Sequence, residues 1–206
     1  MIRSIIIKIK IHKYELCYIN DFKEKGLKRG NQVEMKILKS EKRLCTCCTE
    51  EHEVKTIVKE EQVKFKNRKV SFDSICSYCD REDEYYMDEV QMNDNDIAMK
   101  NAYRRIVGLL TSDEIVSIRR KYGIGQRDLS LLLGWRADTV ARYESHQVQD
   151  KAHDMILRRI GDDPEWFVFL LTEAKQKLGE QAYTKYWAAA QKNVSIIRFV
   201  GKCETD

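Results

Sequence analysis

Two cysteine pairs constrain the fold of this sequence more than any other feature: Cys45-x2-Cys48 and Cys76-x2-Cys79. Each pair, placed on a tight knuckle, can offer two thiolates to adjacent corners of a tetrahedron, and zinc accepts four such sulfurs in a closed structural site. The twenty-seven residues between the pairs can form two or three strands but are too few to bury a large core. A module this small depends on a metal ion, so the spacing predicts one structural zinc ion bound by all four cysteines.

Other interpretations of the cysteines remain open. Cys47 makes the register of the first pair ambiguous, because pairs that include it are sterically poorer but not excluded. A redox dithiol or a set of free buried thiols would use the same residues. His52 is a possible substitute ligand, although a lone surface histidine is the simpler interpretation. The sequence has seven cysteines and no recognisable secretion signal, which favours metal over disulfides, and four cysteine ligands would leave no open position for catalysis.

The net charge of the chain gives little evidence about its partners. Residues 1–34 carry eight Lys/Arg against four Asp/Glu, so the excess of +4 belongs to this segment and residues 35–206 sum to zero. Only local patches can therefore indicate nucleic acid. No apolar run reaches the roughly 18 residues that a membrane span needs, and the apolar start has no small-residue cleavage site. We expect a cytoplasmic protein with no membrane partner.

The stretch from Gln126 to Glu144 has the pattern of two helices joined by a sharp turn at Gly134. A helix-turn-helix of this kind places the N-terminal half of its second helix in the major groove of double-stranded DNA. The apolar positions that pack the two helices together are Leu129, Leu132, Leu133, Val140 and Tyr143. The candidate DNA-binding residues are Gln126, Arg127, Arg136, Asp138, Thr139 and Arg142.

These residue types suit different parts of a DNA duplex. Arg142 can bind guanine O6 and N7 together, and Asp138 can accept a hydrogen bond from cytosine N4. Gln126 at a helix start, with Arg127 and Arg136, is placed for phosphate contact. Residues 117–147 carry six Lys/Arg against three Asp/Glu, which makes this region locally basic. A compact helical domain that does not touch DNA is the alternative. Because one such module buries little DNA surface, we expect a homodimer over two half-sites.

The pattern predicts an α+β chain: a small zinc-bound β module with four cysteine ligands, followed by an all-α helix-turn-helix domain of the Cro-like (XRE) type, with additional C-terminal helices. Either Met35 is the natural start and residues 1–34 are an upstream reading frame, or residues 1–34 contain an ordered N-terminal strand. The aromatic helices at 165–192 are candidates for a dimer interface and also ordinary core material, with the interface slightly favoured.

The expected segments are an N-terminal extension at 1–44, the zinc module at 45–79, an acidic linker and short helix from Asn101 at 80–111, the helix-turn-helix domain at 112–160, and C-terminal helices and tail at 161–206.

The order of these motifs resembles the MqsA-type antitoxins, which carry a YgiT-type zinc finger. The resemblance spans about Cys45 to Leu171 and leaves out residues 1–34 and the tail after about Gly179. The motifs that carry it, besides the two cysteine pairs, are Ile118–Gly123, Gln126-Arg127, Leu133-Gly134-Trp135, Arg142-Tyr143-Glu144 and Gln149–Asp154 followed by Leu157-Arg158.

The resemblance implies an antitoxin of a type II toxin–antitoxin system. Its zinc domain would neutralise a toxin, often an mRNA-cleaving enzyme, while the C-terminal domain dimerises and represses its own operon. Arg142 would read a base, but the neighbouring reading position, commonly Asn in the family, is Asp138 here. The acidic run 80–96 would suit a basic RNA-handling toxin by charge complementarity, or would be a solvated linker.

A stand-alone zinc-containing transcriptional regulator with no cognate toxin is the second hypothesis. An enzyme is the third, and it has little support. None of the four histidines lies in a recognisable catalytic arrangement, and the sequence has no phosphate-binding glycine loop. We therefore expect binding functions and no catalysis.

Overall fold

The computed structural model describes residues 36–203, with side chains as far as Ser195. These residues lie within one compact unit, Met35–Asp206. The two hypotheses about Met35 and the segment before it fall outside the described residues. Among the helices that are described, none combines the length and apolar character needed to cross a membrane.

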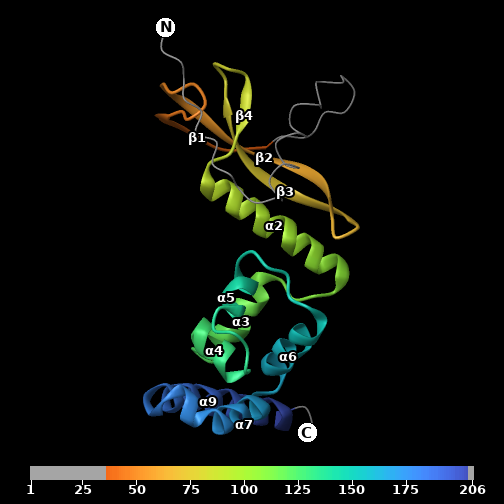
Figure 1. The fold of residues 1–206 in the computed structure, drawn as a ribbon, viewed down its shortest axis with the longest axis vertical. Helices are drawn as coiled ribbons and strands as arrows, with labels where there is room; N and C mark the ends of the chain where they lie inside the picture. The colour runs from red at the N-terminus through yellow and green to blue at the C-terminus, as the bar shows by residue number, and fades with distance from the viewer. Residues whose placement is uncertain (1–35, 204–206) are drawn as a thin grey trace. The chain divides into compact units, whose positions relative to one another are not determined.

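The first part of the described chain is an antiparallel sheet of four strands in the order β1-β2-β3-β4 (Figure 1). Its centre is a long hairpin whose two-residue turn, Lys66 and Asn67, has φ values of 44° and 62°. Turns with positive φ at both positions match the right-handed twist of paired strands. The strands are β1 Lys36–Leu44, β2 Glu51–Phe65, β3 Arg68–Cys79 and β4 Glu84–Tyr86.

Helix α2 (Glu89–Val107) packs against β3. Near its middle, Met99 joins Val70 and Phe72 of the strand in a small buried cluster. The Asn95 side chain donates to the carbonyl of Ile75 and accepts from its N–H, both at 2.8 Å. The expected short helix from Asn101 is therefore the second half of a longer one. Polar contacts attach its first half to the sheet, so no apolar stripe marks its start.

The rest of the described chain is a body of helices, α3 to α9. In its core the Tyr122 and Phe167 rings stack with centroids 3.9 Å apart, and the Tyr122 hydroxyl donates to the Ile160 carbonyl. Phe167 and Tyr186 are buried in this core, whereas Phe169 and Trp187 stay exposed. The C-terminal helices therefore supply core material. The helices are α3 Ser112–Lys121, α4 Gln126–Leu132, α5 Thr139–Glu144, α6 Lys151–Asp162, α7 Pro164–Glu173, α8 Lys175–Leu178 and α9 Glu180–Cys203.

Candidate metal centre and nucleic-acid interface

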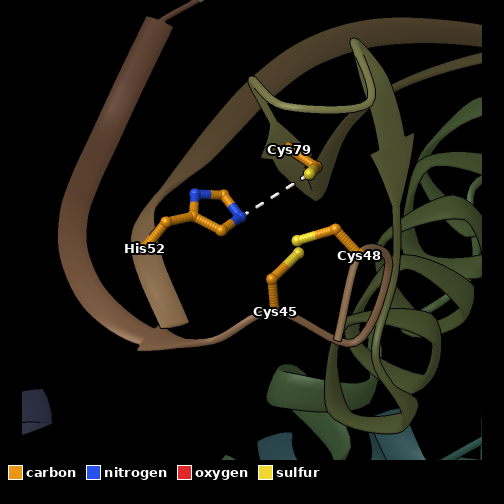
Figure 2. Close-up of side chains that lie close together, drawn as sticks. All are labelled: Cys45, Cys48, His52 and Cys79. Carbon is orange, nitrogen blue, oxygen red and sulfur yellow. Dashed lines mark hydrogen bonds between the residues drawn. The ribbon is translucent and has the colours of Figure 1, made fainter. Parts of the chain in front are cut away.

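Four buried or half-buried side chains from the sheet converge at one point: Cys45, Cys48, His52 and Cys79. Their candidate ligand atoms, three sulfurs and one imidazole nitrogen, all lie within 4.8 Å of one another (Figure 2). Cys45 and Cys48 lie on the turn between β1 and β2, His52 lies near the start of β2, and Cys79 ends β3. The four donors therefore come from three segments that the sheet brings together.

The turn with the first cysteine pair is a tight knuckle of the expected kind. The Cys45 N–H donates to the Glu50 carbonyl at 2.9 Å, and the Thr49 N–H donates to the Cys45 carbonyl at 2.8 Å. Thr49 closes the turn with a φ of 61°. This backbone geometry aims both sulfurs at the same point.

The second pair does not form a knuckle. Strand β3 runs through Cys76 and Cys79, and residues three apart on a strand point to opposite faces. Cys76 is fully buried but lies outside the four-residue cluster, opposite Ile57 in the register. Burial is the main cause of its raised pKa. The structure thus brings together three of the four expected ligands and supplies His52 as the fourth.

The expectation that His52 is a surface residue is wrong, since its side chain is only 7% exposed. Its Nδ1 atom lies 3.0 Å from the Glu53 carbonyl and 3.2 Å from a carboxylate oxygen of Asp80. Both partners are acceptors, so they favour a proton on Nδ1 and leave the lone pair of Nε2 free. Nε2 faces the Cys79 sulfur at 3.6 Å. Metal-binding histidines are held in this way, with the other ring nitrogen donating to a carbonyl or carboxylate.

The cluster also perturbs the thiols. Burial raises the pKa of Cys45, but hydrogen bonding with the Tyr86 hydroxyl and the Cys48 backbone outweighs it and brings the pKa to about 5. Burial, followed by hydrogen bonds with Cys45 and Cys79, raises the pKa of Cys48 to about 11. Several sulfurs crowded in a buried space cannot all carry a charge unless a cation lies among them. A donor set of three sulfurs and one imidazole fits a tetrahedral ion in a closed site.

The predicted DNA-binding residues lie on α4, on α5 and on the turn between them. Gln126 and Arg127 lie at the start of α4, and both are exposed. Asp138 lies between two arginines: its carboxylate oxygens are 3.5 Å from Arg136 Nε and 3.4 Å from Arg142 Nε. The side chains of these three residues are 78%, 50% and 32% exposed, in the order Arg136, Asp138 and Arg142. They form one row of alternating charge in which Arg136 and Asp138 are exposed and Arg142 is half-buried.

Thr139 differs from the expectation that it points outward. It is only 5% exposed, in the first turn of α5. The neighbouring Val140 N–H donates to the buried Ser130 hydroxyl at 3.1 Å. The first turn of α5 is therefore attached to α4, and Thr139 packs inside the helical body.

A partly buried ion pair between α3 and α5 was not expected from the sequence. The guanidinium of Arg119 donates to both carboxylate oxygens of Glu144, at 2.6 and 3.0 Å. The same carboxylate accepts from the Gln126 amide at 2.6 Å. Glu144 thus joins α3, α4 and α5. Opposite charges 25 residues apart give no sequence signal of pairing.

Comparison with known families gives one match. Residues 43–168 match the family described as the antitoxin component of a bacterial toxin-antitoxin system, MqsA. The match covers more than half of the 206-residue chain and includes the metal cluster, α2 and the helices α3 to α6. No curated protein matches the chain.

Proposed function

This chain belongs to the MqsA family of bacterial antitoxins, and we propose that it neutralises a toxin through its metal-bound sheet and represses its own operon through α4 and α5. The family match over residues 43–168 is the observation that carries the antitoxin role, and it confirms the resemblance found in the sequence. The protein acts by binding, in the cytoplasm, and not by catalysis.

The metal is one zinc ion held by Cys45, Cys48, His52 and Cys79. The buried donor set and the orientation of the His52 ring support this assignment. Zinc in a closed site of this kind stabilises a fold, because it cross-links segments that have little apolar core between them. Cys76 packs the sheet and is not a ligand.

The helices α4 and α5 act as a helix-turn-helix of the Cro-like type. The row of Arg136, Asp138 and Arg142 lines the start of α5, the part of such a motif that enters the major groove. Arg142 reads guanine and Asp138 accepts from cytosine N4, while Gln126 and Arg127 contact phosphates. Glu144 holds the Gln126 amide in a fixed orientation. Thr139 contributes packing, and a homodimer presents two such helices to the operator.

The toxin is a basic protein, such as an mRNA-cleaving enzyme. The turn after β3 and the start of α2 carry exposed carboxylates at Glu82, Asp83, Glu89 and Asp94, which favour a basic partner by charge complementarity. The alternative remains a stand-alone regulator with no cognate toxin. A neighbouring reading frame that is toxic alone, and harmless when co-expressed with this chain, supports the antitoxin; an isolated gene supports the regulator.

The first test uses the purified full chain, its metal content and its binding to the DNA upstream of its own reading frame at two salt concentrations. We expect one zinc ion per chain and sequence-preferring binding that weakens with salt. Arg142→Ala removes the preference, since a bidentate base contact contributes about 1–3 kcal/mol of discrimination. Arg159→Ala is the matched control, because Arg159 is an exposed arginine on α6 outside the α4–α5 pair. Binding that is blind to sequence in the unaltered protein would refute the repressor role.

A further inference from the structure

A single arginine, Arg104, joins α2 to the helical body from a fully buried position. Its guanidinium donates to the carbonyls of Tyr143 and Gln147 at 2.7 and 2.8 Å, at the C-terminal end of α5. It also donates to the side-chain oxygens of Gln149 at 3.0 Å and Asn101 at 2.7 Å. Four acceptors from two separate segments therefore fix one side chain in position and direction.

The charge of this side chain has no direct carboxylate partner among residues 36–195. Burial lowers the pKa of Arg104, and the carboxylates of Asp113, Asp154 and Asp96 oppose this only at longer range. A buried charge balanced by neutral acceptors is a poor source of stability, because the loss of hydration outweighs what neutral acceptors return. The guanidinium instead fixes the orientation of α5 relative to α2, because it binds two carbonyls at the end of α5 at once.

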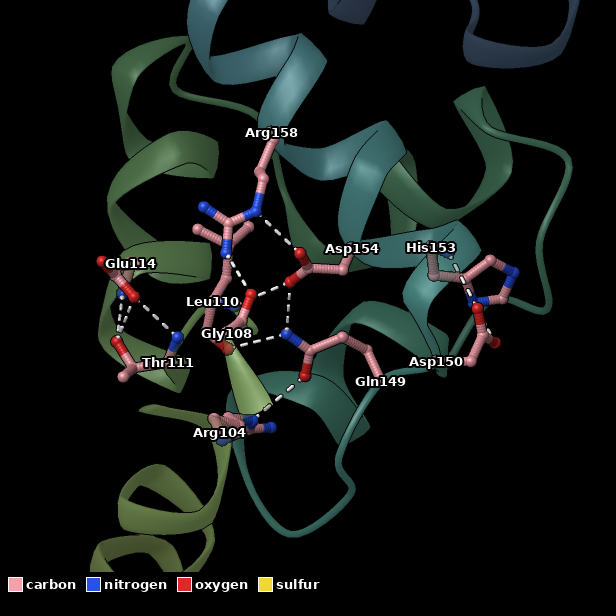
Figure 3. A network of polar contacts seen from close by, with 10 residues as sticks. All are labelled: Arg104, Gly108, Leu110, Thr111, Glu114, Gln149, Asp150, His153, Asp154 and Arg158. Atoms are coloured by element: carbon pink, nitrogen blue, oxygen red, sulfur yellow. Dashed lines mark hydrogen bonds and ion pairs between the residues drawn. The ribbon is translucent and has the colours of Figure 1, made fainter. Parts of the chain in front are cut away.

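The acceptors of Arg104 are themselves held in place. The Gln149 amide nitrogen donates to the Leu110 carbonyl at 2.7 Å and to Asp154 at 2.9 Å, which turns its oxygen toward Arg104 (Figure 3). Asp154 is also paired with Arg158 at 2.7 Å. The network around Arg104 therefore has few alternative arrangements.

The other end of α2 is attached to the metal cluster. The Tyr86 hydroxyl lies 3.5 Å from the Cys45 sulfur, and the N-cap of α2, Asp88, follows two residues later. Gln91 and Asn95 then hydrogen-bond to β3, so both ends of α2 are held by directional contacts. One helix thus runs from the metal cluster to the end of α5.

We propose that Arg104 is a positioning residue that couples the metal-bound sheet to α5, so that metal in the sheet and DNA at α5 bind cooperatively. This inference rests on the proposed DNA-binding role of α4 and α5. Loss of the metal loosens the attachment of α2, and Arg104 transmits that change to α5. By linkage, DNA bound at α5 must strengthen metal retention by the same factor.

The test measures the DNA affinity of the full chain with metal and after chelation, using the duplex upstream of its own reading frame. In the unaltered protein we expect metal removal to weaken binding by about 5- to 150-fold, the range usual for coupled sites. Arg104→Met weakens binding by the metal-loaded protein and removes most of the metal dependence. Arg104→Lys keeps a hydrogen-bond donor and should retain part of the metal dependence. Arg158→Met is the matched control: Arg158 belongs to the same network but does not contact α5, so its metal dependence stays at the unaltered level.

A second measurement separates coupling from mere support of the fold. DNA should slow metal release to a chelator in the unaltered protein and not in Arg104→Met. If Arg104→Met fails to fold, Asn95→Ala provides the same test from the sheet end of α2, where it should reduce both effects. Metal dependence that is unchanged in the folded variant overturns the inference. So does DNA binding by the unaltered protein that ignores the metal, and that result leaves the repressor role intact. Binding with no sequence preference refutes the repressor role itself.

Discussion

The sheet and the helical body are stabilised by different means. The sheet has two small buried clusters, one of which consists of Val54 with two of the metal-site cysteines, Cys45 and Cys79. The helical body has one continuous core that runs from α3 to α9 and includes stacked aromatic rings. Apolar burial contributes about 25 cal/mol per Å², so the helical body can be stable through its core alone. The sheet lacks such a core, and the proposed metal ion would supply the missing stability.

The largest effect should come from breaking the metal site. Cys79→Ser removes a buried ligand, and we expect the sheet to unfold while the helical body stays folded. Zinc binding contributes about 10–16 kcal/mol to the folding of small zinc domains, which exceeds what the clusters in this sheet can replace. Hydrogen exchange resolved along the chain should show fast exchange in residues 36–86 and in the sheet-bound first half of α2, with α3 to α9 still protected. Cys47 is a neighbouring cysteine outside the cluster, so Cys47→Ser should leave both the sheet and the helical body protected from exchange. Loss of protection in both variants would contradict the assignment of Cys79, and not Cys47, as a ligand.

The identity of the fourth ligand gives the next largest effect. His52→Ala should weaken zinc binding by more than the roughly 10- to 100-fold that follows the loss of a supporting residue behind a ligand. Cys76→Ala should retain one zinc ion per chain, because Cys76 lies on the other face of β3. Competition with a coloured chelator measures both affinities. If Cys76→Ala weakened zinc binding more than His52→Ala did, the four cysteines and not His52 would be the ligands.

Within the helical body, the partly buried pair of Arg119 and Glu144 gives the next effect on stability. Glu144 holds the pKa of Arg119 above its usual value, and the two side chains are 17% and 5% exposed. Glu144→Ala leaves the partly buried Arg119 without its charged partner and should cost about 1–3 kcal/mol in the free energy of unfolding, the usual range for hydrogen bonds to charged groups. Glu173→Ala, an exposed glutamate on α7, should change it by less than about 0.5 kcal/mol. Denaturant unfolding provides both values, and equal effects would show that the pair is not needed.

The smallest effect should come from the capping box of α3. The Glu114 carboxylate accepts from the Thr111 N–H at 2.7 Å, and this hydrogen bond is the main cause of its lowered pKa. A lowered folded-state pKa means that the stabilisation is present above the unfolded pKa and is lost as the pH falls through the folded one. Glu114→Gln should therefore cost about 0.3–1 kcal/mol at pH 7 and nothing in strong acid. Thermal unfolding at both pH values checks this, and a cost independent of pH would exclude a role for the charge.

The sequence analysis succeeded where local pattern decides the structure. The first cysteine pair and the sharp turn at Gly134, with a φ of 71°, each follow from a few neighbouring residues. It failed where distant partners decide. The identity of the fourth ligand depends on whether β3 continues through Cys76, and the length of α2 depends on polar contacts to the sheet. Spacing alone reveals neither.

The burial of polar residues was also not predictable from the sequence. Arg104 looks like any surface arginine on a helix, and its burial follows from carbonyls some forty residues away. Thr139 was expected to face the solvent because its neighbours do. In both cases the tertiary packing, and not the residue type, determines the exposure.

The core of the helical body has a practical consequence for protein production, because part of it lies beyond the family match. The family match ends at residue 168, in the middle of α7, so it would be natural to express a fragment that stops there. Such a fragment would lack Leu171, Tyr186 and Ala190 and would present the opened interior to solvent, which invites aggregation. The homology boundary is not the folding boundary, and an expression clone of this protein should extend at least through residue 195.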